Sequence, residues 1–438
     1  GRAMYHNEVY HCFLTAYYYG ERAGLKMPER VRNAVKKMAY ADYKWKKPDH
    51  TQFTQGDSDA SDLRDQITAG AYVFRDRVLK SGGYGIMDYE NAWKFGRAAC
   101  EEYNALEAEE PDFVSVELPF GGNYYLRSGW DEKADLLHFH CGETGGGHGH
   151  ADKLHVDLVI RGEDVLVDSG RYTYVDGPER FTLKESPAHN TFRVDGEGFS
   201  RCEASWKYKE LCTCLKQQFY DGETGAFVEG THLGYWDKGV LANRKIIWIR
   251  PDVYVIVDDM RAHGAHVYEN ILHFDGKGTV ELREIKEGCG GVHFTGKDME
   301  AWIQFTDAAE EELTETEQSS YYNEKHPNQT YIRKAGAEGF YRSITVINGG
   351  KKGETAPVNV EKISLYSVLN AEYLPENRAE GLRITAGDKE YVLFLCHEEV
   401  MMPTDILQWE NCLGHGKAVL FDRSEEKVET VVGEILAW

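Results

Sequence analysis

The amino-acid sequence predicts an α+β multidomain protein, with helical hairpins in its first quarter and a large antiparallel β-sandwich region after them. Apolar residues recur at helical spacing through residues 1–107, whereas short alternating runs separated by Gly and Asp fill the chain from residue 112 onward. The chain has 438 residues, of which 42% are hydrophobic and 28% charged, which excludes a disordered or fibrous protein. At about 150 residues per domain, this length predicts two to three domains.

Four helices are expected in residues 1–107, and they cover residues 6–24, 28–40, 57–80 and 91–108. The third carries one apolar stripe, formed by Leu63, Ile67, Ala71, Phe74 and Val78. Asp57 to Asp59 offer N-caps before it. Helices that begin about 30 residues apart are typical of stacked helical hairpins. Because the chain opens on Gly1 within a helical pattern, we expect further helices before it.

Short strands are expected through the rest of the chain. They cover residues 113–119, 123–129, 134–140, 153–160, 163–168, 245–250, 252–259, 343–347, 389–396 and 417–422. Many short strands at near-regular spacing predict a large antiparallel sandwich or a pair of them. The polar, acidic segment 306–329 is expected to be a surface excursion or a boundary between sheet units. We therefore expect a helical domain at 1–107, a sandwich carrying the site at 112–330, and a C-terminal sheet unit at 331–438.

The charge balance limits the partners of this protein. Fifty Lys and Arg against 73 Asp and Glu give a formal charge of -23, which repels phosphate backbones and excludes nucleic acid as the expected partner. The same repulsion stands against a polyanionic substrate, unless local cations overcome it. No apolar run approaches the roughly 18 to 20 residues of a membrane-spanning helix. The nine cysteines include no CxxC pair, so mostly free thiols are expected.

The densest chemistry lies in residues 136–160, where five histidines fall around a glycine-rich turn. Side chains two apart in a strand share a face, so His148 and His150 are expected to point the same way. Asp168 ends the next expected strand, and His189 precedes another. Imidazoles and a carboxylate from adjacent strands suit a zinc-like ion. The alternative is that these are ordinary hydrogen-bonded sheet residues. His138 and His140 are expected to be such residues, and His155, out of phase, to face away.

These motifs resemble those of a known family. The run HGHADKLHVDLVIRGEDVLVDSGRYTY and the later SPAHNTFRVDG look like the heparinase II/III family of polysaccharide lyases, and AMYHNEV looks like the tyrosine-bearing helix of their toroid domain. The resemblance implies a partial (α/α) toroid of helical hairpins packed on antiparallel sheets. It also implies an acidic polysaccharide or oligosaccharide as the substrate. From the resemblance we also expect a location in the bacterial periplasm or outside the cell, although nine free cysteines would also suit the cytoplasm. The resemblance leaves the oligomeric state open.

The resemblance also assigns residues. It implies His150, Asp168 and His189 as ligands of one divalent metal ion with a structural role, zinc before calcium, and Tyr5 and His148 as the catalytic residues. His6, Asn7, Arg171, Tyr172 and Tyr174 are candidate substrate-binding residues. The family also uses an Asn or His to neutralise the substrate carboxylate, and that residue is expected before Gly1.

Such lyases remove the C5 proton of a uronic acid and expel the oxygen at C4, leaving a double bond. This β-elimination needs a base and an acid, and Tyr serves as a base only where its neighbours lower its pKa. We expect Tyr5 and His148 to face each other from opposite sides of one sugar, about 5 to 10 Å apart. Two other functions stay open. One is a non-catalytic carbohydrate-binding protein with a structural metal site, and the other is a zinc-dependent hydrolase.

Overall fold

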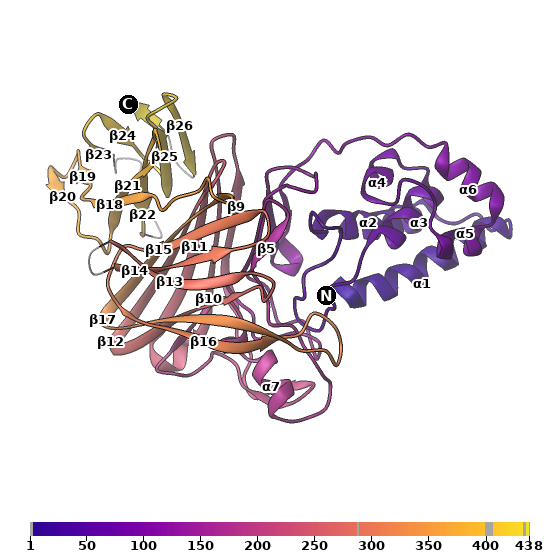
Figure 1. The fold of residues 1–438 in the computed structure, drawn as a ribbon, viewed down its shortest axis with the longest axis horizontal. Helices are drawn as coiled ribbons and strands as arrows, with labels where there is room; N and C mark the ends of the chain where they lie inside the picture. Colours follow the sequence, from indigo (N-terminus) through magenta and orange to yellow (C-terminus); the bar gives the residue numbers. More distant parts are fainter. Residues whose placement is uncertain (1–2, 287–288, 399–405, 432–434, 438) are drawn as a thin grey trace.

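The chain forms a helical unit, a central antiparallel sheet and a C-terminal unit of smaller sheets, arranged one after another along the molecule (Figure 1). The computed structural model describes residues 3–286, 289–398, 406–431 and 435–437. The expected mixture of helices and a large antiparallel sheet is confirmed. Within these residues, no helix has both the length and the apolar character needed to cross a membrane.

The helical unit contains six helices. They are α1 (Ala3–Arg22), α2 (Glu29–Trp45), α3 (Arg64–Phe74), α4 (Arg77–Gly82), α5 (Tyr89–Phe95) and α6 (Arg97–Asn104). The predicted stripe of the third helix is buried from Leu63 to Phe74, where it packs with α1 and α2. Four of these helices replace the two continuous ones that we expected at 57–80 and 91–108. The breaks lie at Arg75, which has the left-handed helical conformation (φ 51°), and at Gly96, whose positive φ (88°) with an extended ψ also ends a helix.

The expected N-caps at Asp57 to Asp59 are wrong. The helix begins later, at Arg64, behind Leu63 and without a side-chain cap. Residues 46–63 form an irregular segment instead, which runs from α2 back to the central sheet. Asp57 and Asp59 are therefore free to bind other parts of the chain.

The central sheet has fifteen strands. They are β1 (Val116–Leu118), β2 (Asn123–Arg127), β3 (Leu136–His140), β4 (His155–Ile160), β5 (Glu163–Leu166), β6 (Phe192–Val194), β9 (Cys214–Asp221), β10 (Gly225–Tyr235), β11 (Val240–Ile249), β12 (Val253–Phe274), β13 (Thr279–Lys286), β14 (Cys289–Thr295), β15 (Met299–Phe305), β16 (Glu310–Gln318) and β17 (His326–Lys351). Helix α7 (Pro178–Lys184) and the hairpin of β7 (Cys202–Ala204) and β8 (Lys207–Tyr208) lie outside it.

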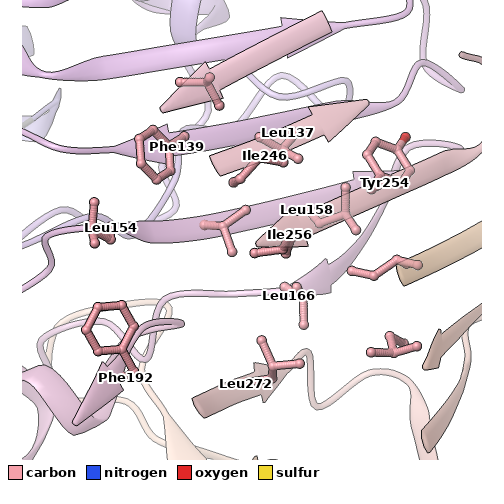
Figure 2. Packing of buried hydrophobic residues seen from close by; sticks show 14 of the residues in the cluster. Leu137, Phe139, Leu154, Leu158, Leu166, Phe192, Ile246, Tyr254, Ile256 and Leu272 are labelled. Atoms are coloured by element: carbon pink, nitrogen blue, oxygen red, sulfur yellow. The ribbon is translucent and has the colours of Figure 1, made fainter. Parts of the chain in front are cut away.

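Strands β12 and β17 join the two parts of this sheet. The first half of β12 pairs with β11, and its second half pairs with β6 and β5. Figure 2 shows the resulting core, where Leu137 and Phe139 of β3 pack near Ile246 of β11 and Ile256 of β12. All four side chains are buried, as expected for strands that alternate between a core face and the opposite face.

The expected division between residues 330 and 331 falls inside β17, so that boundary is wrong. The segment 306–329 holds strand β16, whose exposed and half-buried residues alternate along the edge of the sheet. Because most of its side chains reach solvent, its sequence is as polar as that of a loop. The C-terminal unit starts after β17 and consists of β18 (Asn359–Ile363), β19 (Tyr366–Ser367), β20 (Glu372–Tyr373), β21 (Ala379–Ala386), β22 (Lys389–Cys396), β23 (Leu407–Trp409), β24 (Cys412–Gly414), β25 (Ala418–Asp422), β26 (Lys427–Val431) and β27 (Ile435–Ala437).

Candidate active site

The candidate site lies where the helical unit meets the central sheet. The backbone N–H of Asp57 donates to the carbonyl of His148 (3.2 Å), and that of Ala60 donates to the carbonyl of Ser320 (2.9 Å). The backbone N–H of Met4, near the start of α1, donates to Oγ of Ser58 (3.3 Å), in the same segment as Asp57 and Ala60. The site is thus built from segments that are distant in sequence, and it depends on the contact between the two units.

Asp57 is the centre of the site. One carboxylate oxygen lies 3.0 Å from Nδ1 of His148, and the other lies 2.9 Å from Nε2 of His150. The guanidinium of Arg180 donates to both oxygens, at 2.5 and 2.8 Å. Asp57, His150 and Arg180 are all fully buried. Burial alone would raise the pKa of Asp57, but its bonds to His150 and Arg180 outweigh this and hold the pKa far below its usual value. Asp57 is therefore a carboxylate.

Tyr5 and His148 are in direct contact. Their ring centroids are 3.6 Å apart in a stacked arrangement, and the Tyr5 hydroxyl lies 2.5 Å from that of Tyr174. The expected separation of about 5 to 10 Å is therefore wrong, because stacked rings leave no room for a pyranose between them. The side chain of His148 remains 40% exposed, so the pair is still accessible from one side.

The environment of Tyr5 keeps its hydroxyl protonated. Burial raises the pKa of Tyr5 and the charge of Asp57 raises it further, whereas Arg171 and Arg180 lower it by less. Tyr5 was expected to serve as a base only if its neighbours lowered its pKa, and two arginines that do so are nearby. Their effect is outweighed, so the pKa of Tyr5 is raised.

His150, Asp168 and His189 converge as expected, with one ligand atom from each within 4.8 Å of the others. Nδ1 of His150 and Nε2 of His189 are buried and have no hydrogen-bond partner among the described residues. The other nitrogen of each ring is bound by a carboxylate, Asp57 for His150 and Asp168 for His189. Burial lowers the pKa of His150 to about 4, so its ring is neutral. Two lone pairs beside a carboxylate fit a divalent ion.

The route to this geometry differs from the expected one. His148 and His150 lie in the irregular segment between β3 and β4, not in a strand. Their common direction comes from Asp57, which binds both rings. Gly149 lies between them at a point where a Cβ would come 1.7 Å from the carbonyl oxygen of Thr144, so only glycine fits.

A network of buried histidines packs against the candidate metal ligands. Asp157 binds Nδ1 of His138 (2.8 Å) and Nε2 of His155 (3.1 Å), and it accepts the backbone N–H of Asp168 (3.0 Å). His155 was expected to face away from the site. That expectation is wrong, since its ring lies 5.7 Å from that of His189. Asp157 thus fixes the backbone from which Asp168 projects.

The candidate substrate-binding residues divide into two groups. Arg171 and Tyr174 lie beside Tyr5, with the Arg171 guanidinium 4.7 Å from the centre of the Tyr174 ring. The remaining three have other partners. Tyr172 faces Lys325, His6 binds the carbonyl of Met38 on α2 (3.0 Å), and Asn7 contacts Gln52 (3.0 Å).

Three residues of the site were not predicted from the sequence. Asp57 was interpreted as a helix cap, because acidic residues ahead of an apolar stripe are typical of that role. Arg180 was given no role in the site. Trp206, at the turn between β7 and β8, lies 4.9 Å from His148, ring to ring. Nothing in their local sequence marks them, because the contacts of Asp57 with His148 and Arg180, and of Trp206 with His148, join residues more than fifty positions apart.

The chain is similar in sequence and in fold to known proteins. The chain is 26% identical over 204 residues to the heparin-sulfate lyase of Pedobacter heparinus, a match that covers 44% of this chain and 28% of that protein. Its fold is similar to the heparan sulfate lyase HepC of Pedobacter heparinus, with a TM-score of 0.71 and 18% identity over 91% of this chain and 59% of that one. It is also similar to a solved Heparinase III, with a TM-score of 0.70 and 16% identity over 90% of this chain and 59% of that one.

The chain thus spans less than two thirds of the length of these relatives. The family model for the Heparinase II/III-like C-terminal domain matches residues 114–356, which hold the central sheet and the histidine cluster. Since this match covers more than half of the sequence, the chain belongs to the heparinase II/III-like family.

Proposed function

We propose that this protein is a polysaccharide lyase that cleaves a uronic-acid-containing acidic polysaccharide, such as heparan sulfate or alginate, by β-elimination. The observation that carries the proposal is the stacked pair of Tyr5 and His148, which is held in place by Asp57. A proton donor and a proton acceptor in contact at an accessible surface are what this elimination needs. The names of the relatives, heparin-sulfate lyase and heparan sulfate lyase, support the same substrate class.

In this proposal His148 is the base. Because Asp57 is a carboxylate, it accepts a hydrogen bond from Nδ1–H of His148, which leaves the lone pair on Nε2. Nε2 takes the proton from C5 of the uronate. An imidazole held by a buried carboxylate keeps one tautomer and stabilises the cation that forms.

Tyr5 is then the acid. Its raised pKa favours the protonated phenol, which gives its proton to the leaving oxygen at C4 as the C4–O bond breaks. Because the two rings are stacked, both groups approach the sugar from the same face. This arrangement favours uronates whose C5 proton and C4 oxygen lie on one face, as they do in glucuronate.

We further propose that His150, Asp168 and His189 hold one divalent ion, zinc before calcium. The ion would contribute positive charge and crosslink the segments that carry these three residues. We propose a structural role for the ion. By fixing His150, it would also fix Asp57, which binds both His150 and the proposed base His148. We also propose that helices α1 to α6 form part of an (α/α) toroid.

The test is incubation with heparan sulfate, chondroitin and alginate while ultraviolet absorbance is followed. A rising absorbance is expected, since elimination leaves a double bond conjugated with the carboxylate. Tyr5→Phe should lower turnover by about 10² to 10⁴ without changing the fold, because it removes only the hydroxyl. Cleavage without this absorbance would indicate a hydrolase, and binding without cleavage would indicate a carbohydrate-binding protein.

A further inference from the structure

Three aromatic side chains extend from the catalytic pair across the surface. Tyr174, Trp206 and Tyr322, together called the aromatic row, come from three separate segments of the central sheet region. The ring of Tyr174 lies 5.1 Å from that of Trp206 and 5.3 Å from that of Tyr322. Trp206 also contacts His148, at 4.9 Å between ring centres. The row therefore begins at the catalytic pair and continues away from it.

The two outer rings are open to solvent although their backbones are fixed. Trp206 is 50% exposed and Tyr322 is 41% exposed. The carbonyl of Ser205, just before Trp206, accepts a hydrogen bond from the buried Lys184 (2.8 Å). The N–H of Asn323, just after Tyr322, donates to the carbonyl of Tyr172 (2.7 Å). Large apolar rings that are held in place and left exposed are typical of binding surfaces.

Buried cations lie behind the rings. The guanidinium of Arg171 lies 4.7 Å from the centre of Tyr174 and 5.0 Å from that of Tyr322. Arg180 lies 5.5 Å from the centre of Tyr174 and 5.8 Å from that of Trp206. Nη1 of Arg171 is buried and has no hydrogen-bond partner in the described part of the chain. Arg171 is paired with Asp59 and Arg180 with Asp57, so the N–H group at Nη1 of Arg171 is the donor left for a sugar carboxylate or sulfate group.

We propose that Trp206 and Tyr322 are sugar-binding residues, which stack on the rings of the acidic polysaccharide on either side of Tyr174. This inference rests on the proposed function. The C–H face of a pyranose packs on an aromatic ring, and rings held in advance lose little conformational entropy on binding. Trp206, in contact with His148, takes the ring nearest the reacting bond. Tyr322, which lies beyond Tyr174, takes a ring further along the chain.

The test compares Trp206→Ala and Tyr322→Ala with the wild type on a heparan sulfate disaccharide and tetrasaccharide. Both variants should raise KM for the tetrasaccharide by about 10- to 100-fold, as the loss of a buried aromatic contact predicts. Tyr322→Ala should leave kcat within about twofold, because Tyr322 does not touch the catalytic pair. It should affect the disaccharide much less than the tetrasaccharide. Trp206→Phe should restore most of the loss.

Trp93→Ala is the matched control, since Trp93 is 84% exposed on α5 and remote from the row. It should leave KM unchanged. An unchanged KM in both Trp206→Ala and Tyr322→Ala would overturn the inference, and so would a loss in Tyr322→Ala that is equal for both sugar lengths. A lowered melting temperature that accounts for the loss would also overturn it.

Separate measurements of binding and of elimination distinguish a wrong assignment of the aromatic row from a wrong assignment of the lyase activity. Tetrasaccharide binding is measured by calorimetry in the Tyr5→Phe background, where cleavage is slow. Binding that depends on Trp206, in a wild type that produces no absorbance, would refute the lyase and retain the aromatic row. Elimination with normal KM in both row variants would retain the lyase and refute the row. If neither binding nor elimination occurred with heparan sulfate, chondroitin or alginate fragments, both would be refuted.

Discussion

Replacing Asp57 with Asn tests the centre of the site, because Asn keeps the size of the side chain and removes its charge. Arg180 is fully buried and gives two hydrogen bonds to Asp57, so the substitution leaves a buried guanidinium without its counterion. Removing one partner of a buried ion pair costs about 3 to 5 kcal/mol. The same change removes the carboxylate that fixes the tautomer of His148 through its Nδ1–H. Turnover should therefore also fall by about 10² to 10⁴.

Urea unfolding and the absorbance assay measure these two effects. Asp62→Asn is the matched control, because Asp62 lies on the same segment and pairs with Arg64 while both side chains are about one third exposed. That variant should lose no more than about 1 kcal/mol and keep its activity. A double-mutant cycle with Arg180→Gln should show a coupling of about 0.5 to 3 kcal/mol. Wild-type stability and turnover in Asp57→Asn would refute the reasoning.

Three further predictions concern the metal, the face of attack and the pH dependence. His150→Ala, or treatment with a chelator, should lower the melting temperature and the activity together. The control His263→Ala, at an exposed position, should change neither. A stable but inactive His150→Ala variant would favour an ion that acts directly in the chemistry. Polymers of glucuronate should be eliminated at least about tenfold faster than those of iduronate, because both proton carriers reach one face of the sugar; equal kcat/KM for the two epimers would contradict this. Burial raises the pKa of Asp135 to about 6, although the N–H of Arg161 and the hydroxyl of Tyr254 bind it. Since the folded state holds this proton more tightly, the stability from the protonated form is present below the usual pKa and is lost as pH rises through about 6. The advantage of Asp135→Asn over the wild type in unfolding free energy should therefore grow by up to about 3 kcal/mol between pH 4 and pH 8. A difference that does not change with pH would refute this.

The sequence predicted those helices and strands whose apolar pattern lies within one continuous stretch of residues. The stripe from Leu63 to Phe74 repeats within a single helix, and the alternating runs of β3, β4 and β12 mark strands by their own composition. The breaks at Arg75 and Gly96 were missed, because the apolar pattern continues through them while the backbone does not. Strand β16 was missed for the opposite reason, since its position at the edge of the sheet leaves its composition polar.

The candidate site was predictable only in part, for a related reason. His150, Asp168 and His189 converge as predicted from the spacing and the family motif. The predicted cause, strand parity, does not apply to a pair that lies in a loop. What aligns His148 and His150 is Asp57, which is 91 and 93 residues away from them in sequence. No local pattern encodes such a contact, so the residue that organises the site was interpreted as a helix cap.

The position of Asp57 makes the proposed catalytic mechanism depend on the contact between the helical unit and the central sheet. Tyr5 and Asp57 belong to the helical unit, whereas His148, His150 and Arg180 belong to the sheet region. Near Asp57, Gln55 donates to Asn123 Oδ1 (3.0 Å), which also lies 2.9 Å from Nε2 of His138. Contacts from one irregular segment thus reach both His148 and the buried histidine network beside the candidate metal ligands. In the proposed mechanism the helical unit supplies Tyr5 as the acid and Asp57 as the carboxylate that orients the base, so the sheet region alone holds the candidate metal ligands but lacks half of the proposed catalytic pair.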